Sequence, residues 1–247
     1  MNASHIQRLF DEWGRQQLSP ESVQPWLLNR WEDVQGVDWP PEKVRLMLDH
    51  IQNGLRPEAS GLVVEIGCGN GWILKALKTP SLRVAGLDIS LAMLRLARLF
   101  LPQDFLVGAE MARLPFRSGS LERVLCYFVF LNNEDDDYLQ QTLREIYRVM
   151  KSNGRALIGQ LPDKKLSQDY DQAKKDYERY CRKNFSLGPD FRSRQRFPVR
   201  LFDRSRLARF LTAQGISYRF TNSFNPFYYP GRPETVPWRF DIILQKR

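Results

Sequence analysis

Residues 62–71 read Leu-Val-Val-Glu-Ile-Gly-Cys-Gly-Asn-Gly, an apolar run that passes directly into three alternating glycines. The apolar part predicts a buried strand, because β-branched residues dominate it and a turn signal ends it. Gly67, Gly69 and Gly71 predict a sharp turn at which the backbone comes close to a ligand, since side chains there would block the approach. The residues from Leu74 onward predict a helix. A strand, a glycine turn and a helix in this order indicate a nucleotide-like binding site.

A carboxylate, Asp88, ends the second predicted strand, 21 residues after Gly67. From this position it can accept hydrogen bonds from both hydroxyls of a ribose. The alternative role is a helix cap, which Ser90 can provide instead. The dinucleotide pattern Gly-x-Gly-x-x-Gly is not met from Gly67, and the acidic Glu65 beside the turn favours a neutral or cationic ligand over a pyrophosphate. We therefore expect Asp88 to bind ribose.

Short β-rich runs alternate with helical patterns along the rest of the chain, which is typical of parallel βαβ units. The predicted strands are 62–66, 83–88, 104–108, 123–128, 155–160, 216–220 and 239–245. The main helices between them are predicted at 90–100, 137–150 and 205–214, and Gly215 ends the last of these. The predicted fold class is α/β: a Rossmann-like, doubly wound, mostly parallel seven-stranded sheet with an antiparallel edge strand, plus a helical N-terminal cap and a helical insertion.

The length of 247 residues favours a single domain with four zones. Residues 1–60 form a helical N-terminal cap, 61–160 a cofactor-binding core, 161–200 a helical and basic insertion, and 201–247 a C-terminal helix with strands. Four of the six tryptophans fall in the cap, where packing of a small helical layer explains them and a lid over a ligand is the alternative. No apolar run is long enough to span a membrane and the start does not resemble a signal peptide, so we expect a cytoplasmic protein without membrane contact.

The net charge of +9 is unevenly distributed along the chain. Residues 1–150 carry 16 Lys or Arg and 19 Asp or Glu, whereas residues 151–247 carry 21 and 9. In the basic region 174–200 and its surroundings, aromatic residues interleave with Lys and Arg, as they do in proteins that bind single-stranded nucleic acid. The same residues would also suit a pocket for an aromatic or anionic metabolite. We expect the metabolite pocket and keep nucleic-acid binding through 174–200 as the alternative.

Five stretches resemble the motifs of the class I S-adenosylmethionine-dependent methyltransferases, particularly their type 11-like small-molecule branch. They are Val63–Gly71, Gly86-Leu-Asp-Ile-Ser90, Ala109-Glu-Met-Ala-Arg-Leu-Pro-Phe116 and Leu143–Arg155, with 120–130 similar to the fourth strand of that family. The resemblance implies S-adenosylmethionine as cofactor. It implies that the cofactor-binding residues are Glu65, Gly67, Cys68, Gly69, Gly71, Asp88, Ile89, Glu110, Met111, Cys126 and Tyr127. Within this set, Glu110 is expected at the adenine amino group, Met111 beside the adenine, and Cys126 and Tyr127 by the methionine moiety.

No catalytic residue emerges from the sequence. Leu131-Asn-Asn133 stands where relatives often carry histidines, and His5 and His50, the two histidines of the chain, both lie in the N-terminal zone. Methyl transfer is an in-line displacement that requires alignment and, for a hydroxyl acceptor, removal of a proton, so a conspicuous triad is not needed. The acidic run 134–137 predicts a helix start rather than a metal site. The three cysteines lack metal-ligand spacing, and we expect free thiols and no metal.

The sequence therefore predicts a methyltransferase that uses S-adenosylmethionine and acts on a small-molecule acceptor, by O-methylation. The acceptor is expected to be anionic or aromatic. The alternatives are methylation of RNA or protein, a catalytically inactive module that binds the cofactor, and, more distantly, a dehydrogenase.

Overall fold

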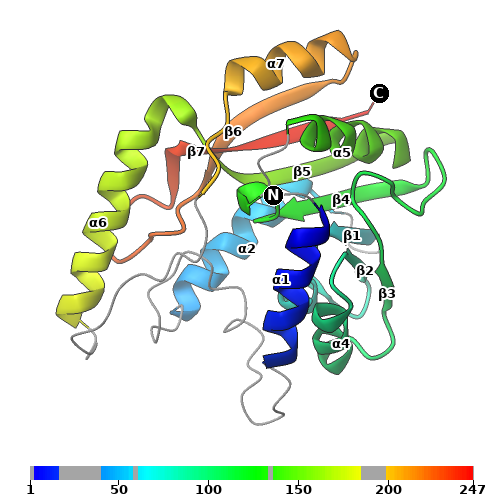
Figure 1. Ribbon diagram of the computed structural model, residues 1–247, viewed down its shortest axis with the longest axis horizontal. Coiled ribbons are helices and arrows are strands. Elements are labelled where there is room, and N and C mark those ends of the chain that lie inside the picture. Colours follow the sequence, from blue (N-terminus) through cyan, green and yellow to red (C-terminus); the bar gives the residue numbers. More distant parts are fainter. Residues whose placement is uncertain (1–2, 17–39, 58–60, 133–135, 185–198, 247) are drawn as a thin grey trace.

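The structure is a computed structural model, and it describes residues 3–16, 40–57, 61–132, 136–184 and 199–246. Seven strands form one sheet in the order β3-β2-β1-β4-β5-β7-β6, with helices on both faces (Figure 1). The predicted class, a Rossmann-like α/β fold with a mostly parallel sheet, is confirmed. The predicted tryptophan-rich part of the N-terminal cap, with Trp26, Trp31 and Trp39, lies outside the described residues.

The strands follow the predicted order with small shifts of their ends. They are β1 (Leu62–Ile66), β2 (Arg83–Asp88), β3 (Phe105–Gly108), β4 (Leu121–Tyr127), β5 (Met150–Pro162), β6 (Tyr218–Phe224) and β7 (Thr235–Gln245). Strands β1 to β5 pair in parallel, while β7 pairs antiparallel with both β5 and β6. The expected antiparallel pairings at one side of the sheet are thus those of β7, which lies between β5 and the edge strand β6.

Seven helices flank the described strands of the sheet. They are α1 (Ala3–Gln16), α2 (Pro41–Leu55), α3 (Trp72–Leu77), α4 (Leu91–Phe100), α5 (Asp136–Val149), α6 (Ser167–Asn184) and α7 (Arg204–Ala213), with short 3₁₀ turns at Phe130–Asn132 and Lys164–Leu166. Ser90 caps α4 by accepting a hydrogen bond from the amide of Met93, as predicted. None of the described helices combines the length and the apolar character that crossing a bilayer requires.

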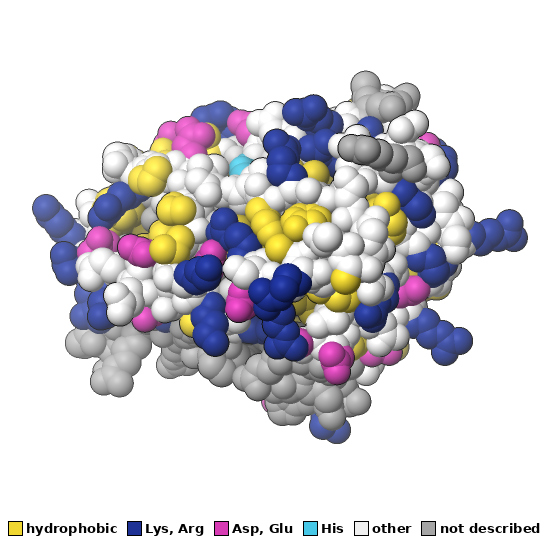
Figure 2. All heavy atoms as spheres, turned by 90° about the horizontal axis from the view of Figure 1, so that it is seen from above, with side chains coloured by type: hydrophobic (Ala, Val, Ile, Leu, Met, Phe, Trp, Pro, Cys, Tyr) yellow, Lys and Arg dark blue, Asp and Glu magenta, His cyan; other side chains and the backbone are white. Residues whose placement is uncertain are grey.

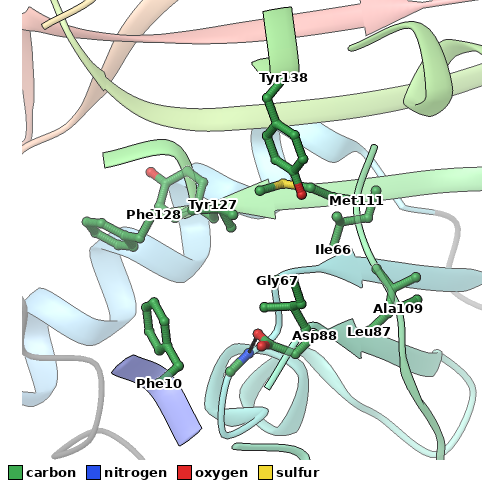
Figure 3. A pocket seen from close by; sticks show the side chains of 13 residues that line it. Phe10, Ile66, Gly67, Leu87, Asp88, Ala109, Met111, Tyr127, Phe128 and Tyr138 are labelled. Atoms are coloured by element: carbon green, nitrogen blue, oxygen red, sulfur yellow. Dashed lines mark hydrogen bonds between the residues drawn. The ribbon is translucent and has the colours of Figure 1, made fainter. Parts of the chain in front are cut away.

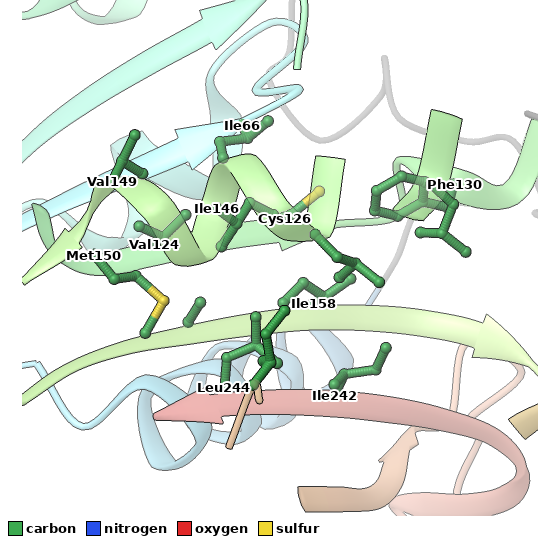
Figure 4. Packing of buried hydrophobic residues seen from close by; sticks show 14 of the residues in the cluster. Ile66, Val124, Cys126, Phe130, Ile146, Val149, Met150, Ile158, Ile242 and Leu244 are labelled. Atoms are coloured by element: carbon green, nitrogen blue, oxygen red, sulfur yellow. The ribbon is translucent and has the colours of Figure 1, made fainter. Parts of the chain in front are cut away.

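Alternating side chains of the strands build two apolar layers, because successive residues of a strand point to opposite faces. On one face, Val64 and Ile66 of β1 pack with buried residues of α5 and α7. Figure 4 shows Ile66 in one layer with Ile146 and Val149 of α5. On the other face, Val63 packs with buried residues of α2 and α3. Burial on both faces explains why these strands read as continuous apolar runs in the sequence.

The strand order reverses at β1, because the chain leaves β1 toward β2 on one side while β4 pairs on the other. The loops after β1 and β4 therefore diverge and leave a crevice at the carboxyl ends of the parallel strands. In this fold, ligands bind at such a reversal point. The glycine turn after β1 lies there.

Replacement of Ile146 by alanine should destabilise the protein by about 2–5 kcal/mol, because its fully buried side chain fills the layer between α5 and the sheet and its loss leaves a cavity. Denaturant unfolding measures this change. The exposed Gln141 of the same helix provides the control, since Gln141→Ala should stay within about 0.5 kcal/mol of wild type. Equal effects of the two variants would contradict the described packing of α5.

Candidate functional site

A cleft opens at the carboxyl ends of β1, β2 and β4 (Figure 3). The space between its walls, with the open solvent at its mouth included, is about 820 Å³. The described residues that line it are Phe10, Ile66, Gly67, Gly69, Leu87, Asp88, Ile89, Ala109, Met111, Tyr127, Phe128, Val129 and Tyr138. The glycine turn, the second strand and the segment 109–111 thus meet at one cavity, as the sequence motifs predict.

The glycine turn has a backbone conformation that demands glycine. Gly67 has a φ of 72°, in the left-handed region, and an added Cβ atom would lie 2.6 Å from a methyl group of Val129. The amides of Gly67 and Cys68 both donate to the carbonyl of Leu87, at 2.7 and 3.0 Å. These bonds tie the turn to the end of β2, so its path along the cleft is set by the neighbouring strand.

Asp88 is held in place by two backbone amides. Its Oδ2 accepts a hydrogen bond from the amide of Gly69 and its Oδ1 one from the amide of Ser90, both at 2.8 Å. Burial raises the pKa of Asp88, and the two amides oppose this increase because they stabilise the ionised form. The carboxylate therefore joins the glycine turn to the start of α4 while facing the cleft.

The charge of the cleft distinguishes between ligand classes. Among the described residues that line it, Asp88 is the single charged side chain, and four others are aromatic. Tyr127 and Phe128 meet edge to face with ring centroids 5.1 Å apart. Aromatic rings and a carboxylate suit a ligand with a positive charge, whereas a pyrophosphate would find no cationic side chain among these residues. The residues present therefore fit a cationic nucleoside such as S-adenosylmethionine.

Glu65 lies buried in β1 next to this cleft. Burial raises its pKa well above the ordinary value and the charge of Asp88 raises it further. Its Oε2 atom accepts no hydrogen bond from any described residue. A buried, unpaired carboxylate oxygen is costly, and a positively charged ligand nearby would reduce that cost.

The segment after β3 forms the wall on the side where adenine is predicted. The amide of Ala109 donates to the carbonyl of Asp88 at 3.1 Å, which brings Ala109 and Met111 to the cleft. Farther along, the carboxylate of Glu145 accepts a hydrogen bond from the amide of Leu114 at 2.9 Å. Arg148 pairs with Glu145 at 2.7 Å and donates to the carbonyl of Leu114 at 3.1 Å. Helix α5 thereby fixes the path of the segment.

Tyr127 connects the cleft to a buried polar network. Its hydroxyl accepts a hydrogen bond from Nε2 of Gln160 at 3.2 Å, and the same amide group donates to the hydroxyl of Ser223 at 2.9 Å. The other end of the Gln160 side chain accepts a bond from Arg239 at 2.9 Å. Gln160 has a φ of 68° and lies where the register between β5 and β7 shifts. The aromatic wall is thus held by the antiparallel part of the sheet.

The structure brings together six of the eleven predicted cofactor residues. The residues that line the cleft are Gly67, Gly69, Asp88, Ile89, Met111 and Tyr127. Those outside the lining are Glu65, Cys68, Gly71, Glu110 and Cys126. Their predicted roles in cofactor binding stay predictions.

The two cysteines point into apolar layers rather than into the cleft. Cys68 packs with Leu74 and Val84 on the α4 face of the sheet, and Cys126 packs in the layer beneath α5. Burial raises the pKa of both thiols, so neither provides a thiolate. The resemblance to the family placed both near the ligand; in β4, alternation of side chains turns Cys126 to the face opposite its neighbour Tyr127.

Gly71 and Glu110 flank the cleft without lining it. Gly71 has a φ of 76° and forms the N-cap of α3. Glu110 is exposed, next to the cleft-lining Met111. The phenol of Tyr138 lies close enough for Glu110 to act on it: burial raises the pKa of Tyr138, and the Glu110 carboxylate raises it further. Tyr138 thus connects Glu110 to the cleft.

Sequence reasoning missed Phe10 of α1, Phe128 and Val129 after β4, and Tyr138 of α5, which complete the walls. Phe128 directly follows the predicted Tyr127 and has a φ of 61°, a strained conformation of the kind found at functional sites. Phe10 and Tyr138 lie in helices whose local pattern indicates amphipathic packing and nothing more. Only their positions in the fold reveal them.

No histidine or lysine is among the described residues that line the cleft. His50 lies on α2, where its Nε2 atom is 2.6 Å from a carboxylate oxygen of Asp241. The side chain of His5 is outside the described part of the structure. Within the described ranges, no three His, Cys, Asp or Glu side chains gather as metal ligands do. Asp136, from the acidic run, starts α5 and pairs with Arg200 and Arg206.

The aromatic residues around α6 pack against one another instead of facing solvent. Tyr170, Tyr177, Phe227 and Trp238 are buried in one cluster, with stacked rings 5.6 Å apart for Tyr177 and Phe227. Figure 2 shows one face of the molecule, on which Lys and Arg side chains are spread among acidic and apolar ones. Residues 185–198 of the predicted basic region lie outside the described ranges. Nucleic-acid binding stays an untested alternative.

The strand order and the position of the cleft define the class I methyltransferase fold. The structure is similar to that of magnesium protoporphyrin IX methyltransferase from Synechocystis PCC 6803 with S-adenosylmethionine bound, with a TM-score of 0.59 over the full length of both chains and 15% identity. This likeness shows the fold alone. Residues 64–158 also match the sequence model of a family described as methyltransferase domain.

Two curated relatives are also named as methyltransferases. The chain is 33% identical over 162 residues to demethylmenaquinone methyltransferase of Thermotoga maritima, an overlap that covers 64% of this chain and 62% of that protein. It is 34% identical over 99 residues to malonyl-[acyl-carrier protein] O-methyltransferase of Legionella pneumophila, which covers 37% of this chain and 33% of that protein. The chain thus spans less than two thirds of the length of these relatives. The fold, the matched domain and these relatives are consistent with a class I S-adenosylmethionine-dependent methyltransferase, and they support S-adenosylmethionine as the cofactor.

Binding of S-adenosylhomocysteine, the demethylated cofactor, should weaken as the pH falls, because ribose hydroxyls donate to the ionised form of Asp88. The raised pKa of Asp88 means that this carboxyl is protonated at a higher pH than an ordinary aspartate. Calorimetric titration across acidic pH measures the slope. In Asp88→Asn the binding should be weaker, and the part of the pH dependence that comes from Asp88 should be lost. Any part of the pH dependence that comes from Glu65 should remain. Equal slopes in the two proteins would contradict the assignment of ribose to Asp88.

Proposed function

We propose that this protein transfers a methyl group from S-adenosylmethionine to a small-molecule acceptor, at an oxygen atom. The observation that carries the proposal is the carboxylate of Asp88, held between the amides of Gly69 and Ser90 at an aromatic cleft whose described lining has no cationic side chain. A ligand with ribose hydroxyls and a positive charge matches both features. The class I fold and the matched methyltransferase domain support the same cofactor.

When bound, S-adenosylmethionine supplies a methyl group that its sulfonium centre has activated. The residues of the chain then act by binding and alignment, which methyl transfer requires above all. Asp88 would hold the ribose, Ile89 and Met111 would enclose the adenine, and the glycine turn would let the backbone approach the methionine end. The rings of Tyr127, Phe128 and Tyr138 would exclude water from the reaction space.

The acceptor side supports a small, flat molecule. Four aromatic side chains among the described lining residues offer an apolar surface for an aromatic acceptor. An acidic oxygen, such as a carboxylate, is ionised at neutral pH and needs no base, which agrees with a described lining that holds no histidine or lysine. Among the relatives, one is named as an O-methyltransferase of malonyl-[acyl-carrier protein] and one as a demethylmenaquinone methyltransferase.

Addition of S-adenosylhomocysteine should stabilise the protein, whereas NAD should not. Both ligands contain ribose, but NAD also carries a pyrophosphate, for which the described lining of the cleft holds no cationic side chain. At a concentration of one hundred times its dissociation constant, S-adenosylhomocysteine should contribute about 2.7 kcal/mol. Thermal unfolding with each ligand measures the difference. Stabilisation by NAD alone would favour a dehydrogenase and contradict the proposal.

Asp88→Ala provides the matched control for this experiment. Its melting temperature should respond much less to S-adenosylhomocysteine, since the ribose would lose its carboxylate partner. A wild-type protein that folds but does not bind S-adenosylhomocysteine would overturn the proposed function. An unchanged response in Asp88→Ala alone would remove only the assignment of the ribose.

A further inference from the structure

Helix α1 borders the cleft, although 50 residues separate its last residue, Gln16, from Gly67 of the glycine turn. It packs beside α4 (Figure 1), and from it Phe10 reaches the cleft (Figure 3). In Figure 3 the ring of Phe10 lies on the side of the cleft opposite Tyr138, between Asp88 and Phe128. Phe10 therefore borders the same space as the predicted ribose-binding carboxylate.

Asp11 ties α1 to the start of α4. One carboxylate oxygen of Asp11 accepts a hydrogen bond from the hydroxyl of Ser90 at 2.6 Å and another from the amide of Ala92 at 3.1 Å. The amide of Ser90 donates in turn to Asp88 at 2.8 Å. The helix is thus anchored two residues after Asp88, at the N-terminus of α4, which favours a negative charge.

Close packing supports the same anchor. A Cβ atom added at Gly14 would lie 2.9 Å from the Cβ atom of Ala92 and 3.1 Å from its carbonyl carbon, so the two helices approach closely there. Phe10 also packs against Met93 and Leu96 of α4. Residues 10, 11 and 14 share one face of α1, because residues three or four apart are neighbours on a helix. One face of α1 thus carries the anchor, the close contact and the ring that reaches the cleft.

We propose that Phe10 is a cofactor-binding residue and that Asp11 is a positioning residue. Asp11 holds α1 over the bound cofactor, so that exchange of the cofactor requires α1 to detach from α4. This proposal rests on the proposed function, because it concerns the cofactor of that function. A wall supplied by a separate helix shields the ligand from water and delays its escape. The alternative is that α1 packs on α4 for stability alone, and the two possibilities differ in the rate at which ligand leaves.

The test measures the release of tritiated S-adenosylhomocysteine from the full chain after addition of excess unlabelled ligand. Asp11→Ala and Phe10→Ala should each speed release about tenfold, the effect of losing one well-packed contact. Glu12→Ala removes the same charge from an exposed position of the same helix and should release ligand at the wild-type rate. Phe10→Leu keeps an apolar side chain against α4 and should also speed release, because the ring is lost.

Hydrogen exchange provides a second measurement that does not depend on the variants. Amides of residues 3–16 should exchange more slowly when S-adenosylhomocysteine is bound, since the ligand keeps α1 in place. Wild-type release rates in Asp11→Ala, Phe10→Ala and Phe10→Leu, or unchanged exchange in α1, would overturn the proposal. A wild-type protein that does not bind S-adenosylhomocysteine would instead overturn the proposed function, so the two failures are distinguishable.

Discussion

The pair of hydrogen bonds from the amides of Gly69 and Ser90 to Asp88 is the interaction on which the site depends. It joins the turn after β1 to the start of α4, and it thereby fixes the distance between these two elements at the cleft. Burial makes the charge of Asp88 costly, and the two amides compensate for part of this cost. A carboxylate with fixed position and remaining acceptor capacity is what a ribose requires.

The walls around this carboxylate come from segments that are distant in the sequence. Phe10 is supplied by α1, which Asp11 anchors, Tyr138 by α5, and Tyr127 by the end of β4. The network of Tyr127, Gln160 and Arg239 extends the support to the antiparallel strands. A low-polarity cleft follows from these positions, with one carboxylate among its described lining residues, and it favours a positively charged ligand over a dinucleotide.

The buried aromatic cluster under α6 shows how composition can be interpreted in two ways. Interleaved aromatic and basic residues are typical of single-stranded nucleic-acid binding, yet Tyr170, Tyr177 and Trp238 form an apolar layer. Arg239 is buried with them, where its guanidinium lies 5.3 Å from the ring centre of Tyr170 and 5.9 Å from that of Trp238. Cation–π contacts within the fold thus account for part of a pattern that also suits an external ligand.

The sequence by itself determined the order and type of the elements, because apolar periodicity, caps and glycines act over a few residues. It also determined that the glycine turn and Asp88 lie close together, since the turn follows β1 and Asp88 ends the neighbouring parallel strand β2. The tertiary structure alone decided which neighbours of these residues face the cleft. Cys68 and Cys126 turn away into apolar layers, while Phe10 and Tyr138 turn toward it from helices whose local pattern indicates only burial. Side-chain direction at such positions depends on how distant helices pack, and no local pattern encodes that packing.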